Sequence, residues 1–390
     1  MENNGMLEKG DLIFDQYVIL GPYAAGGMNS KIYIGNNVTL SDFKLSEWEN
    51  KKVIVKVVKR SNDMKTHNWI KFCEELTTTT RVNHPNLIKT YDVAQPTLRV
   101  RKSNGSTIVI SDVAVIVMEL VDGPSLRNLM KKNPYMSIEE AMYYFQKIVA
   151  GVNKLHNYSH MIIHRDLKPE NILLSRDLRN LKIVDFGISS SIILNKTKLL
   201  TLTNEKALFG TVDYMAPDNF DEEIGPDGKK RRIQPNPQFD FYSLGIILFE
   251  MLTGEKPFTK DPKNDQKTIK KATIYDIPLL KSIRFDVPNS IENIVFRCIA
   301  SKKEDLHFRY KNCEELLNDV NKYNEKKHLN SPLLKPLNKR IFEREIMFNT
   351  LVEKDKEKFY MNKWFFWVVT FFASCIIILT VVILLLKFNH

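Results

Sequence analysis

The sequence predicts an α+β chain with a small strand-rich lobe, a larger helical lobe and one apolar segment near the C-terminus. Residues 11–121 alternate apolar and polar side chains in short runs, which is typical of strands. After Gly123 the apolar residues recur at helical spacing, and residues 364–386 carry no charge. The predicted segments are a tail (1–10), the small lobe (11–121), the large lobe (122–323), a juxtamembrane linker (324–363), a transmembrane helix (364–386) and a short extracytoplasmic tail (387–390).

The small lobe contains two strand signals, one hairpin signal and one helix signal. Residues 53–58 are almost wholly β-branched, as in a buried strand. Residues 67–82 have helical spacing, and Pro85 forbids continuation of that helix. Asn104-Gly105 separates two apolar runs, 98–100 and 108–110, and so predicts a hairpin; residues 114–120 form a further apolar strand.

Four longer helices are predicted in the large lobe, at residues 138–157, 239–253, 291–300 and 313–323. Residues 222–237 contain four consecutive basic side chains between glycine and proline. Such a charge run is usually a solvated loop; a contact with acidic substrate or inner-leaflet lipid is the alternative. The lysine-rich linker favours a further helix at residues 341–360.

The apolar segment 364–386 is long enough, as a helix, to cross a hydrocarbon core of about 30 Å. The alternative is a buried core helix, but such helices are seldom so uniformly apolar. Trp364 and Trp367 stand where aromatic rings favour the headgroup level. Four lysines precede the segment and only Lys387 follows it, so the positive-inside bias predicts a cytoplasmic N-terminal region in a single-pass cell-membrane protein. No extracellular sensor region is expected.

Composition narrows the functional classes. The formal net charge is +11, but the basic residues are spread along the chain with no nucleic-acid-binding motif around them, so nucleic acid is not an expected partner. Cys73, Cys298, Cys313 and Cys375 form no CxxC pair, which argues against zinc and disulfides and fits a reducing compartment. The polar segment 1–10 predicts no secretory signal.

Two short motifs carry most of the functional signal. Residues 164–171 read His-Arg-Asp-Leu-Lys-Pro-Glu-Asn, and residues 185–187 read Asp-Phe-Gly, close to the protein-kinase signature of catalytic loop and metal-binding turn. Phosphoryl transfer needs positioning and charge neutralisation. Asp166 can accept the proton of an attacking hydroxyl, and Lys168 can neutralise phosphoryl charge. Asn171 and Asp185 supply the hard oxygens that suit Mg²⁺.

On these motifs the chain resembles bacterial eukaryotic-like (Hanks-type) serine/threonine protein kinases of the PrkC/PknB group, over roughly residues 11–323. The resemblance implies a two-lobed protein kinase fold that binds ATP with Mg²⁺, or Mn²⁺ as an alternative, and phosphorylates protein serine or threonine. Asn171 and Asp185 are the expected metal ligands. The catalytic set is Asp166, Lys168 and Asn171.

The nucleotide site is also assigned by the resemblance. Residues 24–33 read Ala-Ala-Gly-Gly-Met-Asn-Ser-Lys-Ile-Tyr, in which an alanine stands where the family has its first glycine. Lys56 matches the strand lysine that holds the phosphates, and Glu75 is its expected partner. Ile54 replaces the alanine that usually packs on adenine. The full cofactor-binding set is Ala25, Gly26, Gly27, Met28, Ile32, Lys56, Glu75, Glu119, Val121 and Asp185.

The resemblance places an activation loop between Ile188 and Val212, rich in serine and threonine, with Thr201 and Thr203 as the preferred phosphosites. Residues 216–218 read Ala-Pro-Asp where the family has Ala-Pro-Glu, and Arg309 is the expected partner of Asp218. Asp240 matches the aspartate that braces the catalytic loop.

An active, membrane-anchored kinase regulated by activation-loop autophosphorylation is therefore the favoured interpretation. ATP, protein substrates and the membrane are its expected partners, and a homodimer would permit phosphorylation in trans. A catalytically weak kinase-fold scaffold is the alternative, suggested by Ala25 and Ile54. A kinase that phosphorylates a small molecule could have the same fold, but the motifs at 164–171 and 216–218 fit a protein kinase better.

Overall fold

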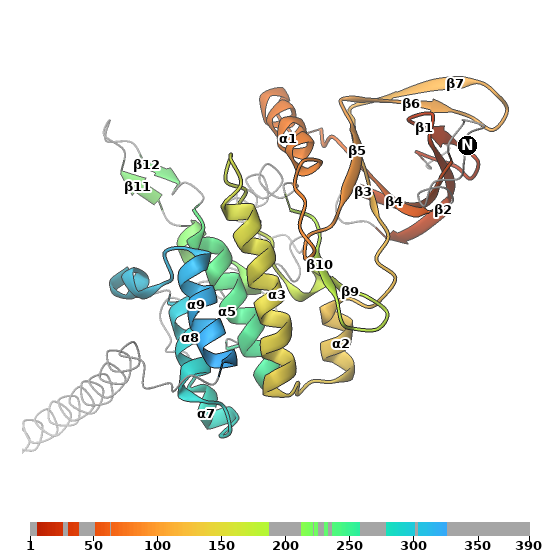
Figure 1. Ribbon diagram of the computed structural model, residues 1–390. Helices are drawn as coiled ribbons and strands as arrows, with labels where there is room; N and C mark the ends of the chain where they lie inside the picture. The colour runs from red at the N-terminus through yellow and green to blue at the C-terminus, as the bar shows by residue number, and fades with distance from the viewer. Residues whose placement is uncertain are drawn as a thin grey trace, which may run out of the picture. The chain divides into compact units, whose positions relative to one another are not determined.

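The structure is a computed structural model, which divides into a compact unit of residues 1–327 and a second unit of residues 328–390. It describes residues 6–25, 30–38, 51–62, 64–186, 212–220, 222–224, 230–232, 236–257, 278–300 and 303–325. All described residues lie in the first unit, which has the β-rich lobe and the helical lobe expected of a protein kinase (Figure 1).

The small lobe is built on an eight-stranded sheet in the order β5-β8-β4-β3-β2-β1-β6-β7, in which every neighbouring pair is antiparallel. The strands are β1 (Leu12–Ile13), β2 (Tyr17–Ala25), β3 (Ser30–Asn37), β4 (Lys52–Lys59), β5 (Thr90–Ala94), β6 (Thr97–Arg101), β7 (Thr107–Ser111) and β8 (Val113–Glu119). The predicted strands at 53–58 and 114–120 and the hairpin at Asn104-Gly105 are confirmed.

Strand alternation divides β8 between two hydrophobic cores. Val113, Val115 and Val117 face a core enclosed by the sheet, while Ala114 and Ile116 face the core shared with the helices. The sheet reaches its full width because β1 joins β2 to β6, which brings the hairpin β6–β7 around the enclosed core. That closure depends on long-range pairing and was not predicted.

Among the described residues of this lobe the one long helix is α1 (Thr66–Thr79), which ends three residues before the predicted Val82. Its last turn is a run of threonines, and hydroxyls of Thr77 and Thr79 bond back to carbonyls of Cys73 and Leu76. Threonine lowers helix propensity through χ1 restriction and local hydrogen bonding, so the helix stops earlier than Pro85 alone requires.

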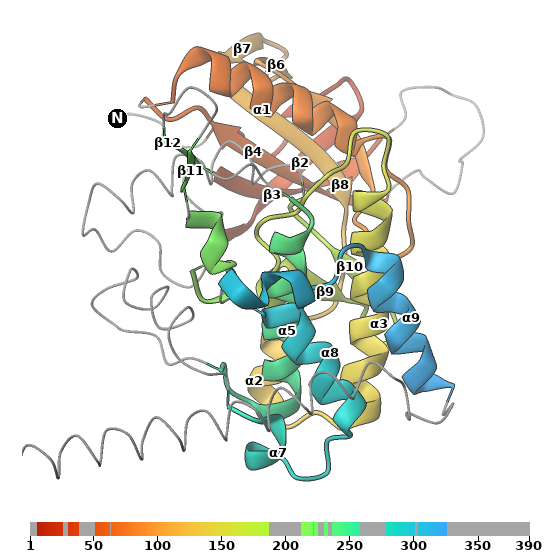
Figure 2. The same ribbon diagram turned by 90° about the vertical axis from the view of Figure 1, so that its left-hand side faces the viewer.

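The large lobe packs its helices around α5, which runs through the core (Figure 2). The four predicted helices are confirmed within two residues at each end, and the sequence reading missed α2 and the short α7. The bounds are α2 (Leu126–Lys132), α3 (Ile138–His156), α5 (Gln238–Thr253), α7 (Leu280–Ile283), α8 (Asn289–Ile299) and α9 (Cys313–Asn324).

Two further hairpins are β9–β10 (Ile172–Leu174, Leu181–Ile183) and β11–β12 (Glu222–Ile224, Lys230–Arg232), the latter within the predicted insertion. Short 3₁₀ turns are η1 (Pro169–Asn171), η3 (Val212–Tyr214), η4 (Pro217–Phe220) and η5 (Lys303–Phe308).

Several expectations concern other parts of the chain. The predicted linker helix 341–360 and the apolar segment 364–386 lie outside the described residues, as does the predicted activation loop (188–212) except for Val212. Among the helices that the structure describes, none has the length and apolar character needed to cross a membrane. Cys73, Cys298 and Cys313 are buried free thiols, whereas Cys375 lies outside the described residues.

Candidate active site

Asp240 on α5 binds the backbone of the catalytic loop. This buried carboxylate accepts hydrogen bonds from the backbone N–H groups of His164 and Arg165, each at 2.8 Å, and contacts His156 Nε2 at 2.8 Å. Burial opposes ionisation of Asp240, but His156 and the loop donors outweigh it and hold the pKa of the carboxyl below its usual range. The bracing predicted for Asp240 is confirmed, and it fixes Arg165 in the left-handed region, at φ 64°.

Asp166 lies within a compact set of polar contacts formed by the loop itself. Its carboxylate oxygens are 2.8 and 3.1 Å from Lys168 Nζ, and one of them accepts a hydrogen bond from Asn171 Nδ2 at 3.1 Å. Asn171 Nδ2 also donates to the Asp166 backbone oxygen at 2.8 Å. The structure thus brings together the three residues predicted to be catalytic.

Lys56 on β4 meets Asp185 across the two lobes. Lys56 Nζ is 2.7 Å from Asp185 Oδ1, although the residues are 129 positions apart in the chain. Burial of Asp185 disfavours its charge, but the ammonium more than compensates and holds the pKa of this carboxyl below its ordinary value. Phe186, next in the chain, is buried in the shared core as expected of a packing residue.

The predicted ion pair between Lys56 and Glu75 is not formed. Among the described residues Lys56 pairs with Asp185 instead. Glu75 on α1 has Arg165 as its main favourable charge neighbour, while burial raises the pKa of the Glu75 carboxyl. Burial likewise lowers the pKa of Arg165, whose Nε has no hydrogen-bond partner among the described residues. The position of α1 therefore gives Glu75 a cationic neighbour other than Lys56.

The remaining nucleotide-site residues are placed by the sheet. Ile32 lies opposite Lys56 in the β3–β4 register. Glu119 ends β8, where its side chain binds Lys182 at 2.8 Å and its N–H donates to the Lys89 oxygen. The backbone of Val121 makes no hydrogen bond to another described residue. Gly26, Gly27 and Met28 lie outside the described residues, as does the side chain of Ala25.

The donor set fits a magnesium–nucleotide complex better than a metal held by protein alone. No cluster of three or more His, Cys, Asp or Glu side chains among the described residues could hold a metal ion. Mg²⁺ usually takes only one or two protein carboxylates and completes its shell with water and phosphate oxygens. Asp185 and the side-chain oxygen of Asn171 would supply the protein ligands, and Lys56 would face the phosphates.

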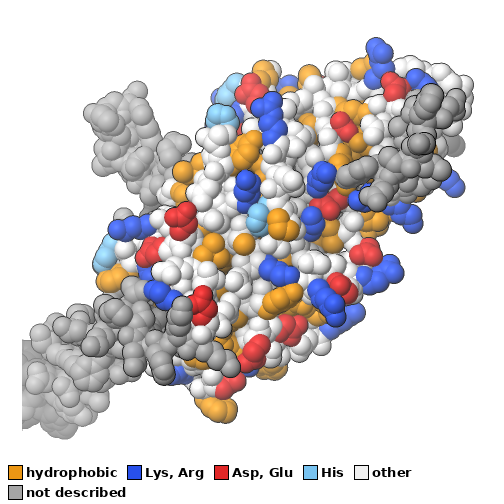
Figure 3. Space-filling view, in the orientation of Figure 1, with side chains coloured by type: hydrophobic (Ala, Val, Ile, Leu, Met, Phe, Trp, Pro, Cys, Tyr) orange, Lys and Arg blue, Asp and Glu red, His pale blue; other side chains and the backbone are white. Residues whose placement is uncertain are grey.

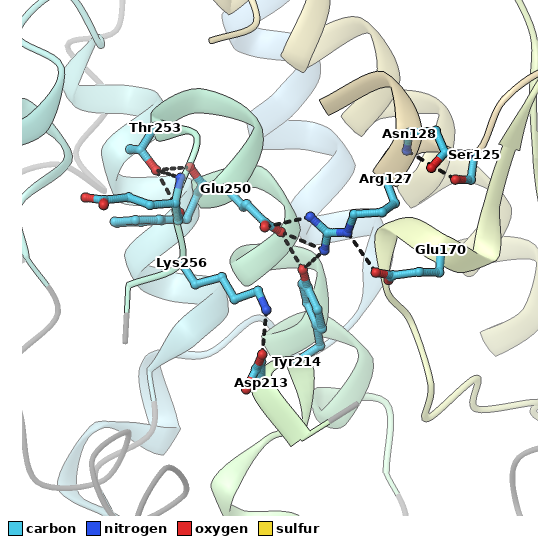
Figure 4. Close-up of polar contacts among 11 residues, drawn as sticks. Ser125, Arg127, Asn128, Glu170, Asp213, Tyr214, Glu250, Thr253 and Lys256 are labelled. Carbon is cyan, nitrogen blue, oxygen red and sulfur yellow. Dashed lines mark hydrogen bonds and ion pairs between the residues drawn. The ribbon is translucent and has the colours of Figure 1, made fainter. Parts of the chain in front are cut away.

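Beside the catalytic loop is a polar cluster that the sequence reading missed. Arg127 on α2 donates to Glu170 at 2.7 Å and to Glu250 on α5 at 2.7 Å, and it also contacts the hydroxyl of Tyr214 (Figure 4). The Tyr214 hydroxyl in turn donates to Glu250, and burial together with that carboxylate raises the pKa of Tyr214 above its ordinary value. Through Arg127 the catalytic loop is linked to η3, the first described segment after the activation loop.

A signal for α2 existed in the sequence. Ser125 is its N-cap and accepts a hydrogen bond from the Asn128 N–H at 3.2 Å, and apolar residues follow at helical spacing. With only seven residues, the helix was too short for a periodicity argument. The contacts of Arg127 could not be predicted from the sequence, because its partners lie 43, 87 and 123 positions away.

Replacing Arg127 with alanine is expected to lower the free energy of unfolding by about 2 kcal/mol, because Glu250, which is 7% exposed, loses its cationic partner. The loss is below that of a fully unpaired buried charge because Tyr214 still donates to Glu250. Urea denaturation measures it. Arg176→Ala is the matched control: its guanidinium is 83% exposed and lies 3.4 Å from Asp122, so a change below about 0.5 kcal/mol is expected. Equal effects of the two substitutions would contradict the conclusion that Arg127 balances the buried charge of Glu250.

Comparison with known proteins agrees with this geometry. The protein kinase domain profile matches residues 37–336, well over half of the chain. The chain belongs to the protein kinase family. A protein of Mycoplasma genitalium named as a candidate serine/threonine-protein kinase is 41% identical over 362 residues, covering 92% of each chain. A protein of Mycoplasma pneumoniae with the same name is 42% identical, over 92% of this chain and 91% of its own.

A more distant relative is the serine/threonine-protein kinase PrkC of Bacillus subtilis, which is 28% identical over 80% of this chain and 41% of its own length. The expected resemblance to bacterial serine/threonine protein kinases is confirmed, and with it the prediction that the chain is an enzyme of this class.

Proposed function

We propose that this kinase transfers the γ-phosphoryl group of ATP to serine or threonine hydroxyls of protein substrates, with Mg²⁺ held at Asp185 and Asn171. The observation that carries the proposal is the 2.7 Å contact between Lys56 and Asp185. A cation for the phosphates and a carboxylate for the metal thereby lie side by side, next to the loop that carries Asp166.

Each chain residue has a distinct task in this proposal. Lys56 binds the nucleotide phosphates, and its present partner Asp185 would turn to the metal once a nucleotide is bound. Asp166 orients the substrate hydroxyl and accepts its proton, while Lys168 balances negative charge on the transferring group. Mg²⁺, when bound, supplies charge neutralisation on the phosphates.

The proposal predicts that purified full-length protein incorporates phosphate from labelled ATP, and that chelation of Mg²⁺ reduces incorporation by at least about 100-fold, since the metal neutralises phosphate charge. Acid hydrolysis of the product should release phosphoserine or phosphothreonine. Asp185→Asn should behave like chelation, whereas Asp177→Asn, at an exposed turn, should leave the rate unchanged. Calorimetric binding of ATP without any metal-dependent transfer would instead favour the scaffold.

Regulation by autophosphorylation between residues 189 and 211 is part of the same proposal. It is supported by the density of hydroxyls in that segment and by Arg165, whose Nε has no hydrogen-bond partner among the described residues. Mass spectrometry of the incubated protein provides the readout. Absence of phosphate from that segment in active enzyme would remove this part of the proposal and leave transfer to other proteins standing.

We further propose that residues 364–386 anchor the kinase in the cell membrane, with the kinase unit on the cytoplasmic side. The support is the uncharged length of the segment and the lysine asymmetry around it. After cell lysis the full chain should sediment with membranes and resist alkaline carbonate, while detergent releases it. Ile376→Arg and Leu379→Arg together should shift it to the supernatant, because each arginine near the middle of the span costs about 2.5–3.5 kcal/mol. Extraction of the unaltered chain by carbonate alone would contradict the anchor.

A further inference from the structure

A buried thiol contacts the histidine that lies behind the catalytic loop. Cys313 Sγ, at the start of α9, is 3.5 Å from His156 Nδ1, at the end of α3. The other ring nitrogen, Nε2, is 2.8 Å from the Asp240 carboxylate that braces the loop. Cys313, His156 and Asp240 are 1%, 7% and 0% exposed. A thiol, an imidazole and a carboxylate thus form a row that leads from α9 to the backbone of the catalytic loop.

Burial makes the members of this row depend on one another. On the face shown in Figure 3, acidic and basic side chains of the described residues are interspersed with apolar ones, where water can satisfy them. Buried polar groups instead need hydrogen-bond partners within the protein. The ring of Phe241 contacts His156 edge-on, at 5.6 Å between centroids, and offers the imidazole no acceptor in the ring plane. The groups at its two nitrogens therefore decide the protonation of His156.

Asp240 fixes the hydrogen on one side of the imidazole. The pKa of the Asp240 carboxyl lies below its usual range, because His156 and the loop donors outweigh the effect of burial. An ionised carboxylate only accepts hydrogen bonds, so His156 Nε2 must carry a hydrogen and donate it to Asp240. Nδ1 is then either a bare acceptor in a neutral ring or a second N–H in a charged ring.

The thiol favours the neutral ring. Burial raises the pKa of Cys313 well above its ordinary value, so the sulfur keeps its hydrogen and can donate it to Nδ1. A charged ring would have only the weakly accepting sulfur for its second N–H, and it would add a cation to the buried row. His156 is therefore neutral, with its hydrogen on Nε2 and an acceptor at Nδ1.

The charge of His156 matters because the ring shares an acceptor with the loop. Asp240 Oδ2 accepts from both His156 Nε2 and the His164 N–H, each at 2.8 Å, while Oδ1 accepts from the Arg165 N–H. Charged donors form stronger hydrogen bonds to carboxylates than neutral donors do, so an imidazolium would weaken the hold of Oδ2 on the loop. Arg165 needs that hold, since its left-handed conformation, at φ 64°, persists only where the surroundings enforce it.

We propose that Cys313 is a positioning residue for phosphoryl transfer: its S–H keeps His156 neutral and in one tautomer, so that Asp240 holds the catalytic loop in its working shape. Cys313 touches no reacting atom and acts only through His156. The inference rests on the proposed function and adds α9 to the elements that support the loop. α9 lies beside α3 (Figure 2), where Gln146 binds Asn321 and Asn324 at 2.9 Å each, so further contacts hold the thiol in place along α3.

Turnover of the full chain in detergent tests this role, with saturating ATP and casein as the protein acceptor. Cys313→Ala removes the donor and should lower turnover by about three- to tenfold, the range that one hydrogen bond commands. The KM for ATP should change little, because Lys56 and Asp185 are untouched. Cys313→Ser keeps a donor and should retain most of the turnover. Cys298→Ala is the matched control: it removes a buried thiol from α8 whose sulfur makes no hydrogen bond to another described residue, so full turnover is expected.

Histidine-selective ¹⁵N spectra supply a readout that a merely structural role would not move. The wild type and Cys313→Ser should show one histidine whose unprotonated Nδ1 accepts a hydrogen bond. That signal should move in Cys313→Ala and stay in Cys298→Ala. Thermal unfolding checks that each variant is folded, and Cys313→Val, which fills the space without a donor, serves if the alanine variant is not.

Three results would overturn the proposal: full turnover in Cys313→Ala, equal losses in Cys313→Ala and Cys298→Ala, or a serine variant as slow as the alanine variant. A ¹⁵N signal that moves equally in both alanine variants would overturn it as well. A wild-type chain that transfers no phosphate would instead overturn the proposed function, and the ¹⁵N spectra would still decide whether the thiol binds His156.

Discussion

Replacing Asp166 with asparagine is expected to slow phosphoryl transfer by about 10²–10⁴-fold, because the variant loses the group that accepts the hydroxyl proton. The shape of the loop should survive. Asparagine keeps one oxygen to accept from Lys168 or Asn171, which lie 2.8 and 3.1 Å from the present carboxylate. The bracing of the loop by Asp240 does not involve the Asp166 side chain.

Turnover at saturating ATP measures this effect, with ATP affinity determined separately by calorimetry. Affinity should change little, because the nucleotide is assigned to Lys56 and Asp185. Asp177→Asn makes the same chemical change at an exposed turn and should retain full turnover. A variant at Asp166 that keeps more than about a tenth of the wild-type rate would exclude it as the proton acceptor.

The catalytic loop was predictable because its parts are close in sequence. Asp166, Lys168 and Asn171 lie within six residues, and a short loop allows few ways to arrange them. The contact of Asp166 with Lys168 requires no knowledge of distant packing. The same holds for the strands around Val55 and Val115, whose alternation follows from which face each side chain presents.

The partner of Lys56 was not predictable in the same way. Two carboxylates, Glu75 and Asp185, could each meet its ammonium, and the choice depends on where α1 lies relative to β4. A burial preference does not decide it, because both carboxylates lose hydration. The position of α1 depends on tertiary packing, and residue types alone do not predict it. Arg127 escaped notice for a similar reason, since its partners come from three distant segments.

The predicted pair between Asp218 and Arg309 is confirmed. Arg309 Nη1 and Nη2 each lie 3.1 Å from one oxygen of Asp218, a bidentate geometry, and Arg309 Nε donates to the Ala300 oxygen at 2.9 Å. The Arg309 side chain is fully buried and that of Asp218 is 7% exposed. Asp218 in η4 thus reaches Arg309, which directly follows η5, although aspartate is one methylene shorter than glutamate.

Arg309→Met is therefore expected to lower the free energy of unfolding by about 3–5 kcal/mol, because it leaves a buried carboxylate without its cation. Urea denaturation measures the loss. Arg176→Met removes an arginine of the exposed pair with Asp122 and should cost below about 1 kcal/mol. A loss at Arg309 no larger than at Arg176 would show that solvent or another group satisfies Asp218.

The double variant Asp218→Leu, Arg309→Met separates the two origins of that loss. If the cost arises from the uncompensated charge of Asp218, removing the carboxylate as well should restore most of the stability, since apolar replacements of buried ion pairs are often neutral. If it arises from lost packing of the guanidinium against Tyr242, whose ring centroid is 5.7 Å away, the double variant should remain as unstable as Arg309→Met. We expect restoration, because methionine retains much of the arginine stem while the bidentate contacts to Asp218 have no substitute.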